Sequence, residues 1–135
     1  MLKNLKWLGL AGVILVAAGV GGCTDPITAN QDPIMQYPQV HMESYYLQQW
    51  TRVQPPITSR VGAGQLHVTV AIRNLTDSDM GLDYKYYFTG PSGSMVENET
   101  GWKLVTIPRK GISQIEFTSL SADARDFRVE LRQRQ

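Results

Sequence analysis

The 135-residue sequence contains a single cysteine, Cys23, and only two histidines, His41 and His67. One thiol excludes an internal disulfide and any zinc site built on several cysteines. The chain also lacks the Gly-x-Ser-x-Gly motif of many serine hydrolases and the His-x-x-x-His spacing of many zinc enzymes. We therefore expect no catalytic residues, no cofactor and no metal, and we predict that the protein is not an enzyme.

The sequence also has almost no excess of positive or negative charge. Thirteen basic residues stand against twelve acidic ones, a formal net charge of +1. Nucleic-acid-binding domains usually carry a strongly basic patch, so no nucleic-acid partner is expected. The nearest approach to such a patch is a set of four arginines, which we assign to the solvated face of a strand and a tail: Arg125, Arg128, Arg132 and Arg134.

Only one long uncharged run is present, from Trp7 to Thr24, and it follows a start with two lysines. Its apolar part, Trp7 to Val20, is 14 residues long. A helix needs about 20 residues to cross about 30 Å of hydrocarbon, so a permanent span is disfavoured. The layout is that of an export signal.

The end of this run, Val20-Gly21-Gly22-Cys23, resembles a lipobox, the cleavage signal of bacterial lipoproteins. The resemblance implies that a diacylglyceryl group is attached to the Cys23 thiol, that the chain is cut before it, and that a further acyl chain such as palmitate is added. Each buried methylene contributes about 0.8 kcal/mol, so these chains would hold the protein on a membrane. Thr24, rather than aspartate, after the cysteine implies the outer membrane. The alternative is an ordinary secretory signal with an unpaired thiol.

The residues after the cysteine predict an extended tether followed by one domain. Three prolines and no periodic apolar pattern occur between Thr24 and Pro38. Docking of three side chains near its end, on the domain or on a partner, is the alternative: Ile34, Met35 and Tyr37. The chain thus divides into a signal peptide (1–22), a lipid-anchored tether (23–38) and a β domain (39–135).

Alternating hydrophobicity dominates the domain and predicts strands. In one run Leu66, Val68, Val70 and Ile72 alternate with His67, Thr69 and Arg73; in the next Leu82, Tyr84, Tyr86 and Phe88 alternate with Asp83, Lys85 and Tyr87. The polar connector NLTDSD between them is rich in turn formers, which predicts that the two runs pair as antiparallel neighbours.

Further strands are predicted around Trp102–Thr106, Ile115–Phe117 and Phe127–Leu131, with weaker candidates at Gln39–Met42 and Leu47–Gln54. Only the segment from Ser119 to Asp126 looks helical. Six or seven short strands at this spacing predict an all-β fold, an antiparallel β-sandwich of two layers.

The segments "VAIRNLTDSDMGLDYKYYFTGPSGSMV", "GWKLVTIPRKGISQIEFTS" and "SADARDFRVELR" follow one another in the chain. In this order they resemble the YcfL-like family of small, uncharacterised bacterial envelope lipoproteins. The similarity spans Leu66 to Arg132. It implies an immunoglobulin-like sandwich and an envelope location, and it brings no catalytic residues.

One acidic stretch begins like a calcium loop, with Asp77, Asp79 and Asp83. Its glycine stands at the fifth rather than the sixth place, and Phe88 replaces the required glutamate. We interpret the stretch as a turn. His67, on the polar side of a predicted strand, is interpreted as a solvent-facing side chain.

Exposed tyrosines are enriched where proteins or glycans bind. Tyr45, Tyr46 and Tyr87 are the candidates for an interaction surface, since Tyr84 and Tyr86 are expected to face the core. We expect a non-catalytic protein, anchored through lipid on Cys23 at the periplasmic side of the outer membrane, that binds periplasmic or outer-membrane proteins in an envelope or secretion assembly. Two alternatives stay open: a homo-oligomeric ring subunit whose β-edges pair between copies, and a peptidoglycan- or glycan-binding module.

Overall fold

The computed structural model describes residue 34 and residues 36–135, so Cys23, the hydrophobic run and most of the predicted tether lie outside the described residues. No helix in the described part is long and apolar enough to traverse a bilayer. The elements there are β1 (Val40–Met42), α1 (Tyr45–Trp50), β2 (Thr51–Val53), β3 (Ile57–Val61), β4 (Gln65–Asn74), β5 (Met80–Thr89), β6 (Lys103–Ile107), β7 (Ile112–Thr118) and β8 (Asp126–Gln133).

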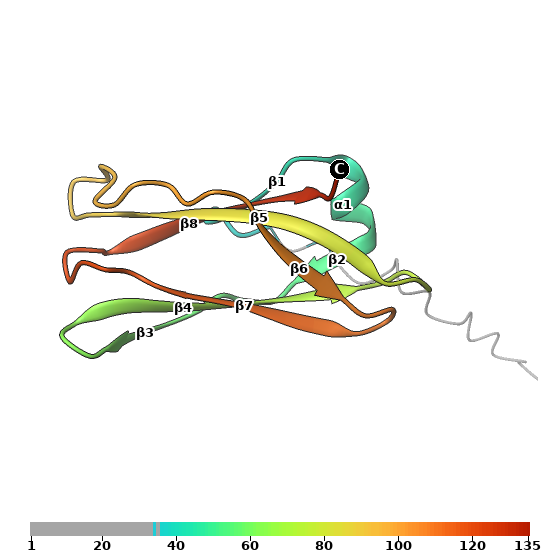
Figure 1. The fold of residues 1–135 in the computed structure, drawn as a ribbon, viewed down its shortest axis with the longest axis horizontal. Coiled ribbons are helices and arrows are strands. Elements are labelled where there is room, and N and C mark those ends of the chain that lie inside the picture. The colour runs from blue at the N-terminus through green and yellow to red at the C-terminus, as the bar shows by residue number, and fades with distance from the viewer. Residues whose placement is uncertain (1–33, 35) are drawn as a thin grey trace, which may run out of the picture.

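The strands form two sheets that face each other (Figure 1). Sheet A has the order β1-β8-β5-β6, and in sheet B the central β4 pairs with β7 on one side and with β2 and β3 on the other. In immunoglobulin terms β3, β4 and β7 take the places of strands A, B and E, and β5, β6 and β8 those of C, C′ and F. Where strand G would lie, β1 pairs with β8 in parallel. The predicted sandwich is confirmed, with eight strands in the described part of the chain instead of six or seven.

The predicted alternation along the two long strands is confirmed. On β4 the side chains of Leu66, Val68, Val70 and Ile72 are buried, and on β5 those of Leu82 and Phe88. Tyr84 and Tyr86 are partly buried and pack against this core. The residues between them on β5 therefore lie on the opposite face of sheet A.

The prediction that these two runs pair with each other is wrong. β4 belongs to sheet B and β5 to sheet A, and the connector crosses from one sheet to the other. Both sides of β4 are already paired, with β7 and with β2 and β3. Facing β5 across the core, β4 buries its apolar side against the apolar side of β5.

The strand predicted over Leu47–Gln54 is wrong in its first half, which is helical. Ser44 caps α1, because its hydroxyl accepts a hydrogen bond from Leu47 N at 3.2 Å. Leu47 is buried in the core. After this helix of six residues the chain extends into β2, and the Thr51 hydroxyl donates to Leu47 O. So short a helix leaves little periodic signal in the sequence.

Strand β3 was not predicted. It lies beyond Pro55-Pro56, along the same side of β4 as β2. Prolines lack the N–H that a ladder needs, so the pair separates two short strands that share one neighbour.

The helix predicted from Ser119 to Asp126 is wrong as well, because distant groups satisfy the backbone of this segment. Glu97 Oε1 accepts hydrogen bonds from Leu120 N (2.6 Å) and Ser121 N (2.8 Å). The buried Ser119 hydroxyl accepts from Leu66 N at 2.8 Å and donates to Ser121 O. These bonds hold an irregular turn that joins β7 to β8.

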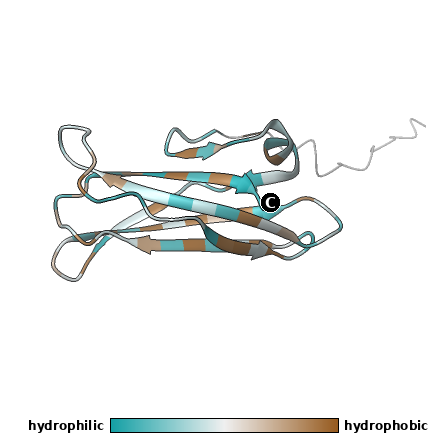
Figure 2. Ribbon diagram, turned by 45° about the horizontal axis from the view of Figure 1, so that its top comes forward, coloured by the Kyte–Doolittle hydropathy of each residue, from teal (hydrophilic) through white to brown (hydrophobic). Residues whose placement is uncertain are grey.

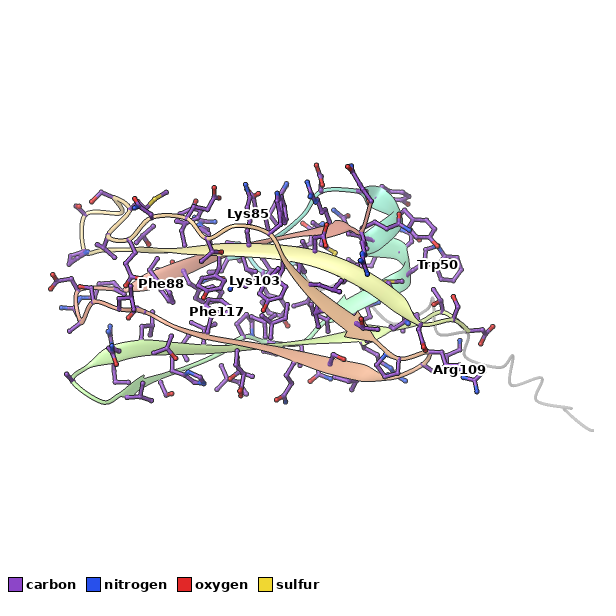
Figure 3. The ribbon with its side chains drawn as sticks, viewed as in Figure 1. Trp50, Lys85, Phe88, Lys103, Arg109 and Phe117 are labelled. Atoms are coloured by element: carbon purple, nitrogen blue, oxygen red, sulfur yellow. The ribbon has the colours of Figure 1, made fainter. Side chains whose placement is uncertain are left out.

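Hydrophobic and hydrophilic residues alternate along the strands of the two sheets (Figure 2). Between the sheets an aromatic cluster fills one end of the core, and Figure 3 labels two of its members, Phe88 and Phe117. Tyr86 stacks on Phe117, with ring centroids 4.2 Å apart, and Phe88 and Phe127 lie within 6 Å of Phe117. Burial raises the pKa of Tyr86, and Tyr84 and Glu97 add to the shift. The phenol is therefore neutral at physiological pH.

The end of the predicted tether lies on the domain. Tyr37 is half-buried and packs against the core. Val129 N donates to Gln39 O at 2.8 Å, and the Arg128 guanidinium donates to Pro38 O. Of the three side chains considered for docking, Tyr37 thus contacts the domain, Ile34 is exposed and Met35 lies outside the described residues.

Candidate interaction face

The outer face of sheet A carries side chains from all four strands, and most of them are polar or aromatic. Alternation along each strand, together with the strand register, places them on one side of the sheet. We call the following set the sheet A outer face: His41 of β1, Arg128, Glu130 and Arg132 of β8, Asp83, Lys85 and Tyr87 of β5, Leu104 of β6, and Trp102 just before β6. Figure 3 shows Lys85 pointing away from the core.

Ion pairs run across this face. Lys85 Nζ lies 3.3 Å from carboxylate oxygens of both Glu99 and Glu130. Arg132 Nε donates to Asp83 Oδ2 at 3.3 Å. Desolvation lowers the pKa of Lys85, but hydrogen bonds and charge from Glu130 and Glu99 outweigh it, so the net pKa lies above its usual value. Lys85 therefore stays protonated, and its two ion pairs hold it in the middle of the sheet A outer face.

Trp102 lies over these cations. The Arg132 guanidinium carbon is 3.9 Å from the indole ring centroid, and Lys85 Nζ is 4.9 Å from it. Both distances are within the range of cation–π attraction. The side chain is nevertheless 38 % exposed. The result is an immobilised aromatic surface that solvent reaches, which is typical of residues that anchor a binding partner.

A broad hollow adjoins the charged part of the face, between β1, β8, β5 and the loop after β5. Its volume is about 740 Å³. Tyr87, His41 and Arg128 line it from the sheet, and Met95 from the loop. This part of the surface offers hydrogen-bonding and apolar groups together.

The outer face of sheet B has a different character. Its strands place no Phe, Tyr or Trp there. The side chains that the register puts on it are Arg52 of β2, Ile57, Ser59 and Val61 of β3, Gln65, His67, Thr69, Ala71 and Arg73 of β4, and Ile112, Gln114, Glu116 and Thr118 of β7. Of the two outer faces, that of sheet A therefore carries the aromatic side chains.

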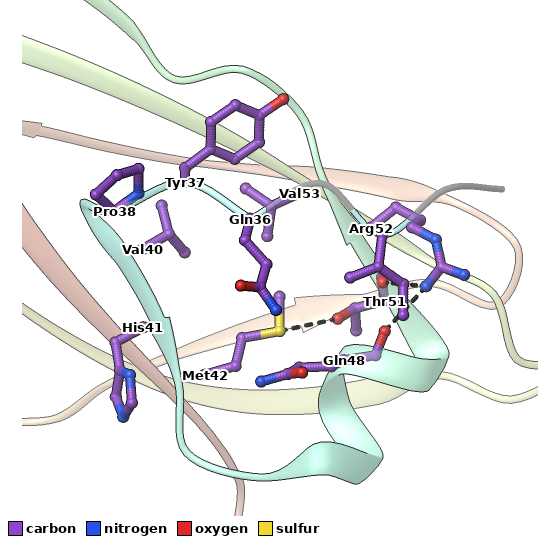
Figure 4. A pocket seen from close by; sticks show the side chains of 11 residues that line it. Gln36, Tyr37, Pro38, Val40, His41, Met42, Gln48, Thr51, Arg52 and Val53 are labelled. Atoms are coloured by element: carbon purple, nitrogen blue, oxygen red, sulfur yellow. Dashed lines mark hydrogen bonds between the residues drawn. The ribbon is translucent and has the colours of Figure 1, made fainter.

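A second cavity, of about 380 Å³, lies between the segment before β1, helix α1 and β2 (Figure 4). Tyr37, Val40 and Met42 line one wall. Opposite them, the Thr51 hydroxyl lies 3.6 Å from Met42 Sδ and the buried Arg52 donates to Gln48 O at 3.0 Å. The Arg52 guanidinium also lies within hydrogen-bonding distance of the carbonyls of Gln49 and Thr51. It therefore stabilises the C-terminal end of α1.

The three aspartates of the acidic stretch bind separate groups. Asp79 accepts a hydrogen bond from Arg109 N at 3.0 Å, Asp83 pairs with Arg132, and Asp77 lies 3.5 Å from Lys110 Nζ. No group of three His, Cys, Asp or Glu residues that could hold a metal ion occurs in the described part of the chain. The two histidines lie in different sheets, and His67 Nδ1 is 2.7 Å from the Thr118 hydroxyl.

The model of a family described as "Protein of unknown function (DUF1425)" matches residues 38–133. The chain belongs to the DUF1425 family. A crystal structure of a DUF1425 member from Shewanella sp. pv-4 has 26 % sequence identity and a TM-score of 0.56, over 63 % of this chain and 79 % of that one. The crystal structure of Campylobacter jejuni cj0090 has 17 % identity and a TM-score of 0.61, over 71 % of this chain and 98 % of that one. The comparison with curated proteins gives no match.

The three tyrosines proposed from the sequence do not form one surface in this DUF1425 member. Tyr45 and Tyr46 are exposed on α1, where the Tyr46 ring lies 6.3 Å from that of Trp50. Tyr46 lines a hollow beside Gly81, at one end of β5. Tyr87 lies six residues further along β5, about 20 Å away at about 3.3 Å per residue. It is half-buried and faces outward beside Lys85, as predicted.

Sequence reasoning missed Trp102 as a candidate for the interaction surface. The alternation of Trp102, Leu104 and Thr106 with Lys103 and Val105 indicated a strand but did not say which side faces the core. The structure buries Ile107 and half-buries Val105, so Trp102 and Leu104 lie outside. The sequence did contain a signal, since alternation places the aliphatic residues Val105 and Ile107 together on the side opposite Trp102.

Proposed function

We propose that this DUF1425 protein is a YcfL-like outer-membrane lipoprotein, anchored through Cys23, whose domain is a non-catalytic module that binds other envelope proteins. The export-signal layout and the sequence Val20-Gly21-Gly22-Cys23 support the anchor. The partner would be a periplasmic or outer-membrane protein of an envelope or secretion assembly.

The difference between the two sheet faces carries the interaction part of the proposal. Sheet A presents Trp102 held on Arg132 and Lys85, with a hollow of about 740 Å³ alongside. Interface hot spots are enriched in Trp, Tyr and Arg, the residue types gathered here. The ion pairs hold these side chains in place before a partner arrives, which reduces the entropy lost on binding.

The anchor is tested on full-length protein produced in a Gram-negative bacterium. We expect mass spectrometry to find Cys23 as the first residue, carrying a diacylglyceryl thioether and an amide-linked acyl chain. The matched variant Cys23→Ser should leave the outer-membrane fraction, because about 0.8 kcal/mol per buried methylene is then lost. Recovery of an unmodified Cys23 with residues 1–22 still attached would contradict the anchor.

The interaction face is tested by placing a photo-crosslinking amino acid at position 102 of the full-length protein in living cells. We expect a crosslinked product that contains an envelope protein. Ile112 is the control position, because it is also exposed and apolar but lies on the outer face of sheet B. Equal yields from the two positions would argue against a sheet A partner, and products formed with peptidoglycan would favour the glycan-binding alternative.

A further inference from the structure

Strand β3 forms an exposed edge of sheet B, at the margin of the lower sheet in Figure 1. All five of its residues are exposed. Ile57 and Val61 both lie on the outer face, 67 % and 38 % exposed, because they stand opposite Thr69 and Gln65 of β4. Natural proteins usually protect an edge strand with charged side chains, an internal proline or a bulge, whereas Ile57–Val61 has no proline and no bulge, and Arg60 is its one charged residue.

The hydrogen bonds of Leu66 on β4 show which backbone N–H and carbonyl groups of β3 point away from the sheet. The Leu66 N–H donates to the Ser119 hydroxyl and its carbonyl accepts from Ser119 N, both on the side away from β3. The pair Arg60–Leu66 is therefore a non-hydrogen-bonded one. Since such pairs alternate along an antiparallel ladder, Thr58 and Arg60 turn their N–H and carbonyl groups outward, to where a further strand would lie.

The order of residues along β3 makes this edge complementary to itself. An antiparallel second copy centred on Ser59 sets Thr58 against Arg60 and Arg60 against Thr58, which satisfies the outward groups of both. The same register sets Ile57 of one copy opposite Val61 of the other in the close, non-hydrogen-bonded spacing. We propose that two copies of the protein pair through β3 about a two-fold axis at Ser59.

Charge does not oppose this pairing. Arg60 is the only charged residue of β3, and its guanidinium is drawn back to its own hairpin. It donates to Gly64 O at 3.0 Å and to Ala122 O at 3.5 Å. The two guanidinium groups are thus held at opposite ends of the paired strands, away from the axis.

The size of the contact sets its strength. Two strands of five residues bury less than the roughly 1,000 Å² expected of a stable complex, so the dimer is weak in dilute solution. Copies anchored in one membrane have a raised effective concentration, which favours the pairing. Only this concentration rests on the proposed lipid anchor; the register at Ser59 does not.

The test is disulfide trapping in membranes that contain the full-length Ser59→Cys protein. A non-hydrogen-bonded pair brings its Cα atoms to about 4.5 Å, which lies within the range of about 4.4–6.8 Å that a disulfide requires. We expect mild oxidation to give a disulfide dimer, and two differently tagged copies to be recovered together. Gln114→Cys is the control, because Gln114 is also exposed in mid-strand but on β7, along the other edge of sheet B.

A second variant tests the register. Adding Ile57→Lys to Ser59→Cys should lower the dimer yield several-fold, because two Ile57–Val61 contacts are lost at positions that contribute little to the fold of one copy. Dimer yields at Ser59→Cys no higher than at Gln114→Cys would overturn the proposal. A disulfide dimer formed by the protein without Ser59→Cys would instead show that the Cys23 thiol is free. That result would contradict the lipid anchor and would leave the β3 pairing to be decided by the Ser59→Cys and Gln114→Cys yields.

Discussion

Replacing Phe117 with alanine is expected to lower the free energy of unfolding by about 4 kcal/mol. Phe117 lies at the centre of the aromatic cluster, stacked on Tyr86 and within 6 Å of Phe88 and Phe127. Its removal takes away buried apolar area and leaves a cavity that the neighbouring rings fill only in part. Urea unfolding, followed by tryptophan fluorescence, measures the change.

The control is Leu120→Ala, since Leu120 is 84 % exposed in the turn just after Phe117 and β7. We expect it to change the unfolding free energy by no more than about 0.5 kcal/mol. A loss below 1 kcal/mol for Phe117→Ala would mean that the cluster does not hold the two sheets together.

Asn74→Ala is expected to destabilise the protein by about 3 kcal/mol. Asn74 is fully buried at the end of β4. The two hydrogens of its amide nitrogen are shared among three carbonyls, those of Ser78, Ile107 and Pro108, at 2.8–3.3 Å. Its amide oxygen accepts from both the backbone and the hydroxyl of Thr76. One side chain therefore joins the β4–β5 crossing to the β6–β7 turn, and alanine leaves the buried groups among its partners unpaired.

Thermal unfolding of Asn74→Ala beside Asn98→Ala separates this effect from a general loss of asparagine, because Asn98 is exposed in the loop before β6. Asn98→Ala should unfold at nearly the same temperature as the unmodified protein. If the two variants unfold alike, the hydrogen bonds of Asn74 contribute little to stability.

The role of Asn74 illustrates what could be foreseen from the sequence. The connector NLTDSD after an alternating run indicated a turn, which the structure contains. That the same amide also reaches Ile107 and Pro108 could not be foreseen, because those residues lie more than thirty positions away. Contacts of that length depend on which sheet each strand joins, and the period of two along a strand is the same in either sheet.

In the sheet A outer face, too, the sequence predicted the features that depend on one strand but not the contacts between strands. Alternation was enough to place Asp83, Lys85 and Tyr87 on one side of a strand. The partners of Lys85 come from two other segments, the loop before β6 (Glu99 and Trp102) and strand β8 (Glu130), which meet only because β6 and β8 flank β5. Tyr45 and Tyr46 looked equivalent to Tyr87 in the sequence, yet the helix that carries them lies at the other end of β5.

By itself, the amino-acid sequence determined the all-β class, the inward and outward sides of the long strands and the expectation of a lipid on Cys23, because these depend on local periodicity and on one short motif. The tertiary structure alone decided that β4 and β5 face each other across the core, that Ser44–Thr51 forms a capped helix, and that Trp102 lies on Arg132 and Lys85. The physical reason is that burial and long-range hydrogen bonding outweigh local preference wherever the two compete, as in the turn held by Glu97 where local preference favoured a helix.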